Sequence, residues 1–196
     1  MTSSDDLTRQ VLDAARAAYA KRGYVETTVK GVAAAAGVAP DVVRRYYANR
    51  EALFAAAMRL PVDPATSIAQ LLAPGIDGLG ERMVRVTLRM LDDPETREQL
   101  VEMVRMGSGA SKATASMREF FESTVIDRVV AFLGVPDARM RASLAMSYLL
   151  GVATSRYVLR IEPLASATED EIVAMVGPAV QAALTTPTAS PLTPRG

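Results

Sequence analysis

The chain lacks two side chains on which many enzymes and secreted proteins depend. Its 196 residues contain no cysteine and no histidine. Without cysteine it can form no disulfide, no thiolate metal site and no cysteine nucleophile. Without histidine it lacks the usual general base, the usual zinc ligand and the usual switch near neutral pH. We therefore expect no catalytic residue, no metal site and no cofactor.

Long hydrophobic runs and aromatic residues are also scarce. No apolar run approaches the roughly 18 residues that suggest a membrane span. The first ten residues, MTSSDDLTRQ, are polar and acidic, unlike a secretory signal. Aromatic residues make up only 5% of a chain that is 49% hydrophobic and rich in Ala, Val, Leu and Met. This composition predicts an all-α, cytoplasmic protein that makes no membrane contact.

The net charge of zero conceals an uneven distribution. Residues 1–60 hold nine Lys or Arg and six Asp or Glu, a balance of 9 − 6 = +3, which leaves 13 − 16 = −3 for the remainder. A basic N-terminal module followed by an acidic body is consistent with nucleic-acid binding by one end of the chain. The difference is small, so this interpretation needs a motif to support it.

That motif lies in residues 23–54, GYVETTVKGVAAAAGVAPDVVRRYYANREALF. The pattern predicts a short helix over residues 28–36 and a second one over residues 40–47. Gly37 suits the left-handed residue that closes a helix, and Pro40 suits a first helical position. The spacing is typical of a helix-turn-helix, whose second helix enters the DNA major groove. A preceding helix over residues 5–22 is expected to support the pair.

The succession GY, TTV, VA, AGVAP, YY and NREALF resembles the DNA-binding domain of the TetR family of bacterial transcription regulators. The resemblance implies an N-terminal three-helix helix-turn-helix domain joined to a C-terminal helical bundle for ligand binding and dimerisation. It also implies a homodimer that binds a palindromic double-stranded DNA operator as a transcriptional regulator, most simply a repressor. The expected DNA-binding residues are Thr28, Lys30, Pro40, Asp41, Val42, Arg44, Arg45, Tyr46 and Arg50.

Specific roles follow for some of these residues. A guanidinium such as that of Arg45 can bridge two acceptors of a guanine. Tyr46 and Arg50 match positions that contact phosphates in the family, and Asn49 is expected to cap the next helix. Two positions depart from the family pattern: Ala39 replaces a capping Ser, and Arg44 replaces an aromatic or aliphatic residue. The operator is therefore expected to differ from those of members that match the pattern better.

The rest of the chain reads as a series of amphipathic helices, the pattern of a bundle. A flexible hinge is expected over residues 107–116. The helix over residues 137–161 contains ASLAMSYLLGVA, which is apolar or small on all sides. Such a helix needs cover on both faces. By resemblance, this helix and the last one, over residues 168–184, form a four-helix dimer interface with their twins, and Leu149 is a candidate interface residue.

These patterns predict three segments: a DNA-binding domain over residues 1–60, a ligand-binding and dimerisation domain over residues 61–184, and a disordered tail over residues 185–196. The ligand is expected to be an unidentified small molecule. Flexible Met and aromatic side chains suit an adaptable apolar cavity, although residues of this kind at helical spacing more often belong to a packed core. The candidate ligand-binding residues are Met83, Thr87, Met103, Met106, Phe120, Phe121, Met146, Tyr148 and Arg156.

Two alternatives remain at this point. One is a DNA-binding regulator without a small-molecule ligand, controlled by a protein partner or by its abundance. An enzyme is the other class. Its acidic pairs, Asp92 with Asp93 and the run Glu169 to Glu171, lie at expected helix starts, where they complement the helix dipole rather than form a site. No nucleophile with a base and no phosphate-binding glycine loop accompanies them.

Overall fold

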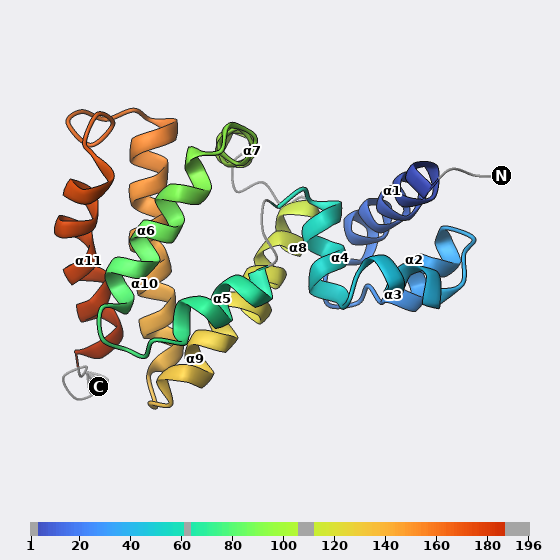
Figure 1. Cartoon of the computed structure of the whole chain (residues 1–196), viewed down its shortest axis with the longest axis horizontal. Helices are drawn as coiled ribbons and strands as arrows, with labels where there is room; N and C mark the ends of the chain where they lie inside the picture. The colour runs from blue at the N-terminus through green and yellow to red at the C-terminus, as the bar shows by residue number, and fades with distance from the viewer. Residues whose placement is uncertain (1–3, 61–63, 106–111, 187–196) are drawn as a thin grey trace, which may run out of the picture. The chain divides into compact units, whose positions relative to one another are not determined.

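The computed structural model describes residues 4–60, 64–105 and 112–186 (Figure 1). Every regular element in these ranges is a helix, which confirms the predicted all-α class. The chain divides into two compact units, one formed by residues 1–70 and 98–128 and the other by residues 71–97 and 129–196. The division into domains at residue 60 stays a prediction. The expected tail from residue 187 onward lies outside the described residues.

The first unit contains the predicted helix-turn-helix. Its helices are α1 (Ser4–Arg22), α2 (Val29–Ala35), α3 (Pro40–Tyr46), α4 (Arg50–Ala57) and α8 (Lys112–Phe121), with a π-helical turn, η1 (Glu122–Ile126), directly after α8. Helix α1 packs against α2, α4 and α8. Helices α5 (Pro64–Leu72), α7 (Pro94–Arg105) and α9 (Asp127–Leu133) each run along the chain from one unit into the other.

Aromatic side chains form the centre of the first unit. Tyr19, Tyr24, Phe54 and Phe120 are all fully buried. The rings of Phe54 and Phe120 stack with centroids 4.5 Å apart, and Tyr24 meets both of them edge to face. Burial of its hydroxyl raises the pKa of Tyr19. Aromatic pairs in these arrangements are each worth about 0.5–1.5 kcal/mol beyond the area they bury, so this cluster joins α1, α4 and α8 firmly.

Helix α4 ends at Ala57, and α8 begins at Lys112. Arg59 adopts a left-handed backbone with φ of 54°, and the amide of Leu60 donates to the carbonyl of Ala55, which closes the helix as a glycine often does. The expectation of a flexible hinge over residues 107–116 is wrong from Lys112 onward, where the chain is helical, and residues 107–111 lie outside the described residues. Buried Ser116 donates to the carbonyl of Tyr19, which fixes that part of α8 against α1.

The second unit is built on three long helices. They are α6 (Leu79–Asp92), α10 (Ala138–Ala153) and α11 (Glu169–Thr185), and each packs against the other two (Figure 1). A π-helical turn, η2 (Thr154–Val158), extends α10. On α10 the buried side chains are mostly small and recur at helical spacing: Ala138, Ala142, Ala145, Leu149 and Ala153. Small side chains let neighbouring helices approach closely.

The closest approach in this unit is between α6 and α11. A Cβ atom added to Gly80 would lie 2.3 Å from the carbonyl oxygen of Gly177. No larger residue fits there unless the two backbones separate. Gln181 completes the contact, because its side chain accepts from the amide of Gly80 and donates to the carbonyl of Ile76. Both glycines are therefore required by the helix spacing.

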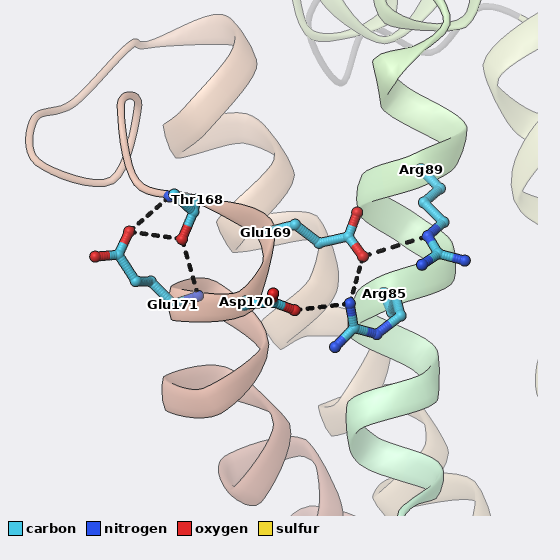
Figure 2. A network of polar contacts seen from close by, with 6 residues as sticks. All are labelled: Arg85, Arg89, Thr168, Glu169, Asp170 and Glu171. Atoms are coloured by element: carbon cyan, nitrogen blue, oxygen red, sulfur yellow. Dashed lines mark hydrogen bonds and ion pairs between the residues drawn. The ribbon is translucent and has the colours of Figure 1, made fainter.

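A polar network joins the same two helices near the start of α11 (Figure 2). Arg85 of α6 contacts Glu169 at 2.6 Å and Asp170 at 2.9 Å, and Arg89 contacts Glu169 at 3.3 Å. Beside it, Thr168 and Glu171 form a reciprocal capping box at the first turn of α11. Hydrogen bonds from Thr168 lower the pKa of Glu171. The acidic run thus stabilises a helix start, as predicted.

Candidate nucleic-acid interface and ligand site

The turn between α2 and α3 has the predicted backbone. Gly37 adopts a left-handed conformation with φ of 66°, and the amides of Gly37 and Val38 donate back to carbonyls of α2. Pro40 occupies the first turn of α3. Ala39, at the N-cap position, makes no side-chain cap, as expected where the family pattern has a Ser. At the start of α2, by contrast, the hydroxyl of Thr28 accepts from the amide of Gly31 at 3.0 Å.

Gly31, inside α2, lies close to the side chains of Thr28 and Arg22. A Cβ atom at this position would lie 3.2 Å from the Thr28 hydroxyl and 3.6 Å from a guanidinium nitrogen of Arg22. A Cβ would therefore be in ordinary contact with Arg22, and the capping hydroxyl would have to shift by a few tenths of an ångström to accommodate it.

Helix α3 presents one buried and one exposed face. Val43 is fully buried and Val42 is partly covered, while Asp41, Arg44 and Arg45 are exposed. The two neighbouring tyrosines separate as expected: Tyr46 is 46% exposed, whereas Tyr47 is partly buried and burial raises its pKa. Thr28 and Lys30 of the preceding helix are exposed as well. These exposed residues form the candidate DNA-reading surface.

One ion pair on this surface affects how Arg44 can act. The guanidinium of Arg44 lies 3.1 Å from the carboxylate of Asp41, one turn earlier. Both side chains are largely exposed, and such pairs contribute only about 0.2–1 kcal/mol. DNA can therefore displace Asp41 at small cost. Arg45 has no such pair among the ion pairs of the described residues.

Arg50 begins α4 and makes several contacts within the unit. Asn49 caps the helix by accepting from the amide of Ala52 at 2.7 Å, as predicted. The Arg50 guanidinium lies over the ring of Tyr24 at 4.3 Å and donates to the carbonyl of Val25 at 3.3 Å. Its side chain remains 34% exposed. Because a guanidinium has five N–H donors, Arg50 can keep these contacts and still bind a phosphate.

The candidate ligand-binding residues are divided between the two compact units. Met83 and Thr87 lie on α6, and the side chain of Met146 on α10 is partly buried. Phe120 is fully enclosed by aromatic rings of the first unit, where it serves as core, and Phe121 beside it is 37% exposed. Tyr148 is exposed on α10. The side chains of Met103 and Met106 lie outside the described residues.

Arg156 serves the loop between α10 and α11. One guanidinium nitrogen donates to the carbonyls of Leu164 at 2.6 Å and Ala167 at 2.7 Å. The Nε atom of the same residue is buried without a partner among the described residues. The contacts explain why an arginine stands in this otherwise apolar helix. They do not favour its predicted role as the partner of an anionic ligand.

A groove that the sequence does not indicate lies along α1 and the end of α4. Its volume is about 480 Å³. Arg16 borders it and donates to the carbonyl of Ala57 at 2.8 Å, which ties α1 to the last turn of α4. The lining consists of Asp5, Thr8, Arg9, Leu12, Asp13, Arg16, Ala56 and Arg59. This groove lies in the first unit, whereas the ligand was expected in the domain over residues 61–184.

Residues 4–60, 64–105 and 112–186 contain no group of three or more acidic side chains placed to hold a metal ion. No helix among them is long and apolar enough to cross a membrane.

Family models match both parts of the chain. Residues 11–57 match the model described as bacterial regulatory proteins of the tetR family, and residues 77–184 match the tetracyclin repressor-like C-terminal domain. No curated protein matches the chain.

Solved structures show the same similarity. A TetR-family regulator from Streptomyces coelicolor is 35% identical, over 93% of this chain and 97% of that one, with a TM-score of 0.52. NalD from Pseudomonas aeruginosa, the secondary repressor of the MexAB-OprM multidrug efflux pump, is 14% identical over 90% and 94% of the two chains, with a TM-score of 0.50. The second similarity concerns the fold alone.

Proposed function

The chain belongs to the TetR family of bacterial regulatory proteins and is a DNA-binding transcriptional regulator, and we propose that it is a repressor that binds a palindromic operator as a homodimer. The observation that supports this most directly is the exposed face of α3, with Arg44, Arg45 and Tyr46 on a helix oriented by Gly37 and Pro40. Such a protein acts in the cytoplasm, where the operator lies, and the proposal assigns it no catalytic step.

The roles of the DNA-facing residues differ in kind. Arg45 reads a base, and Val42 contacts a thymine methyl group at the start of α3. Thr28, Lys30, Tyr46 and Arg50 hold phosphates, which set the register but carry no sequence information. Pro40 and Asp41 lie at the end of α3 that approaches the bases. Arg44 joins them once DNA displaces Asp41.

Operator binding is the experiment that tests the proposal. The purified protein is titrated with the DNA just upstream of its own gene at several salt concentrations, with random DNA of equal length beside it. We expect tight binding of two protomers, or a multiple of two, per site, with a steep salt dependence. Binding no tighter than that to random DNA would contradict this operator. A selection from random DNA would then test whether any operator exists.

Single substitutions separate the two kinds of contact. Arg45→Ala is expected to relax base preference at one operator position, a loss of about 1–3 kcal/mol of discrimination. Tyr46→Phe is expected to weaken binding to all DNA sequences alike. Arg139→Ala on α10 removes the same charge outside the helix-turn-helix and serves as a control. Unchanged base preference in the Arg45→Ala protein would refute its reading role.

The dimer is proposed to form through α10 and α11. Met140, Leu144 and Tyr148 recur along α10 and are 42–69% exposed, and Met175 of α11 is 81% exposed. An apolar stripe of this kind marks a contact surface. Leu149 is a poor probe of it, contrary to the sequence-based choice, because it is buried within the protomer. Leu144→Glu is expected to give monomers in sedimentation, with Arg139→Glu as an exposed control on the same helix.

A small molecule bound in the second unit is proposed to release the operator. It can do so only if it binds the released state more tightly than the DNA-bound state. Met83, Thr87 and Met146 stay as the lining candidates that share this unit. The alternative is a regulator controlled by a protein partner or by abundance. Thermal shifts with a panel of apolar compounds distinguish the two, because a specific ligand raises the melting temperature with concentration.

A further inference from the structure

Two residues of the turn between α1 and α2 are held from opposite sides by different helices. Tyr24 and Val25 follow Gly23, whose φ of 89° lets the chain turn sharply after α1. Side-chain polar contacts to these two residues come from Glu119 of α8 and from Arg50 and Glu51 of α4, and Glu51 accepts from the Tyr24 hydroxyl at 3.2 Å. All five residues belong to the first compact unit. These polar contacts therefore link Arg50 to α8 through the turn.

On one side, the carboxylate of Glu119 accepts both backbone amides of the turn. Its Oε2 atom lies 2.8 Å from the amide nitrogen of Tyr24 and 3.1 Å from that of Val25. The carboxylate also fills the space where a Cβ of Gly23 would stand, at 3.0 Å. Hydrogen bonds to an ionised carboxylate are about twice as strong as neutral ones. Phe120, the next residue of α8, packs on the Tyr24 ring at 5.2 Å between centroids.

On the other side, Arg50 contacts the same two residues. Its guanidinium donates to the carbonyl of Val25 at 3.3 Å and lies over the face of the Tyr24 ring at 4.3 Å. The neighbouring Glu51 lies 4.0 Å from the same guanidinium, at the limit of an ion pair, whereas the contacts to Tyr24 and Val25 reach back about 25 residues. The direction of the guanidinium therefore depends on where the turn lies. The position of the turn depends in part on Glu119.

We propose that Glu119 is a positioning residue for DNA binding, which acts through Tyr24 and Val25 to orient the phosphate-binding Arg50. This inference rests on the proposed role of Arg50. It makes α8 a structural part of the DNA-binding unit although α8 begins more than fifty residues after α4 ends. The continuous helical segment formed by α8, η1 and α9 leads from Glu119 into residues of the second unit. A shift of that segment would move Glu119 and, with it, the phosphate contact.

Operator affinity of three variants gives the first test. Glu119→Ala removes both hydrogen bonds and is expected to weaken operator binding about tenfold. Glu119→Gln keeps an oxygen acceptor of the same shape and is expected to lose less. Glu122→Ala is the matched control, because it removes an equal charge from an exposed position three residues later. Removal of an acidic charge by itself strengthens DNA binding. A tenfold weaker affinity in the Glu119→Ala protein would therefore be opposite to the effect of the charge.

A double-mutant cycle separates positioning from mere stability. Arg50→Ala is measured in the wild-type chain and in the Glu119→Ala chain. If Glu119 acts through Arg50, Arg50→Ala costs much less in the second background, and the two losses are not additive. In the Glu122→Ala background, Arg50→Ala should cost the same as in wild type. Additive losses for Glu119 and Arg50 would overturn the proposal.

Amide hydrogen exchange gives a readout that needs no DNA. The amides of Tyr24 and Val25 are expected to lose protection in the Glu119→Ala protein while those in the middle of α1 keep theirs. Unchanged protection at these two amides would also overturn the proposal. If the wild-type protein binds no operator, the proposed function is contradicted. The exchange experiment still tests whether Glu119 holds the turn, because it needs no DNA. The two failures are thus distinguishable.

Discussion

The two compact units are packed by different kinds of side chain. In the first, four aromatic rings from α1, the turn after it, α4 and α8 fill the centre, and Phe54 and Phe120 stack on each other. In the second, α6 and α11 meet at the glycine pair Gly80 and Gly177, α10 contributes mainly alanines, and aliphatic side chains fill the rest of the core. The first core depends on large aromatic rings that fill space. The spacing of α6 and α11 in the second depends on the lack of side chains where their backbones meet.

This contrast predicts opposite sensitivities to mutation. Removal of volume should damage the first unit most, because an aromatic ring leaves a cavity that its rigid neighbours cannot fill. Addition of volume should damage the second unit most, because an extra methyl group meets backbone atoms that cannot turn aside.

The largest effect is expected for Phe120→Ala. Loss of the buried ring should lower the free energy of unfolding by about 3–5 kcal/mol, as measured by urea denaturation. Phe121→Ala is the control, since Phe121 is partly exposed and should cost far less. Equal losses for the two variants would show that the aromatic cluster does not dominate the first unit.

Gly80→Ala tests the opposite sensitivity in the second unit. The new methyl group would lie 2.3 Å from the Gly177 carbonyl oxygen. We expect a net loss of about 2 kcal/mol, because overpacking outweighs the gain in helix propensity. In Gly151→Ala on α10, where no atom lies within 4 Å of the new Cβ in the protomer, the free energy of unfolding should rise by about 0.5–1 kcal/mol. A stabilised Gly80→Ala protein would disprove the close-approach account.

The capping box of α11 gives a smaller effect with a pH dependence. Thr168→Ala should cost about 1 kcal/mol, whereas Thr185→Ala, at the other end of the helix, should cost little. Hydrogen bonds lower the pKa of Glu171 in the folded state. The stability contributed by ionised Glu171 is therefore complete above its unfolded pKa and disappears as the pH falls through the lowered folded pKa. Thermal melts from about pH 6 down to about pH 3 span the ordinary pKa of a glutamate. The melting temperature of the wild-type protein should fall over this range, and the fall should be smaller in the Thr168→Ala protein.

The smallest effect is expected for the ion pairs between α6 and α11. Arg89→Gln removes one partner of Glu169 but leaves Arg85 in place. The melting temperature should fall slightly at low salt, and the difference should shrink as salt is added, because exposed pairs are screened. Arg85→Gln, which removes contacts to both Glu169 and Asp170, should have the larger effect of the two. A loss that is insensitive to salt would indicate that the arginine stems act by packing.

Local sequence rules were sufficient for most helix ends and for the helix-turn-helix. Gly37, Pro40, Asn49 and Thr168 each act within three or four residues of their own position, so their effect is readable from the chain. The end of α4 could not be read from the chain in this way, because the left-handed residue there is Arg59 and no glycine marks it. The orientation of α3 follows from its apolar spacing, which buries Val43 and leaves the arginines outside.

Several assignments required partners that lie far apart in the chain. Phe120 has the same local pattern as a pocket residue, and only its contact with Tyr24 and Phe54 identifies it as core. Leu149 and Leu144 both belong to an apolar helix, but packing buries one and exposes the other.

The sequence by itself determined that this chain is all-α, that residues 23–54 form a helix-turn-helix, and which residues of α3 face outward, because each of these depends on local spacing and backbone preference. Only the tertiary structure decided that Glu119 and Arg50 hold the same turn and that Gly80 faces Gly177. Those contacts join residues up to about a hundred positions apart, as with Gly80 and Gln181. No local pattern encodes them, because each residue's neighbours along the chain are compatible with many other partners.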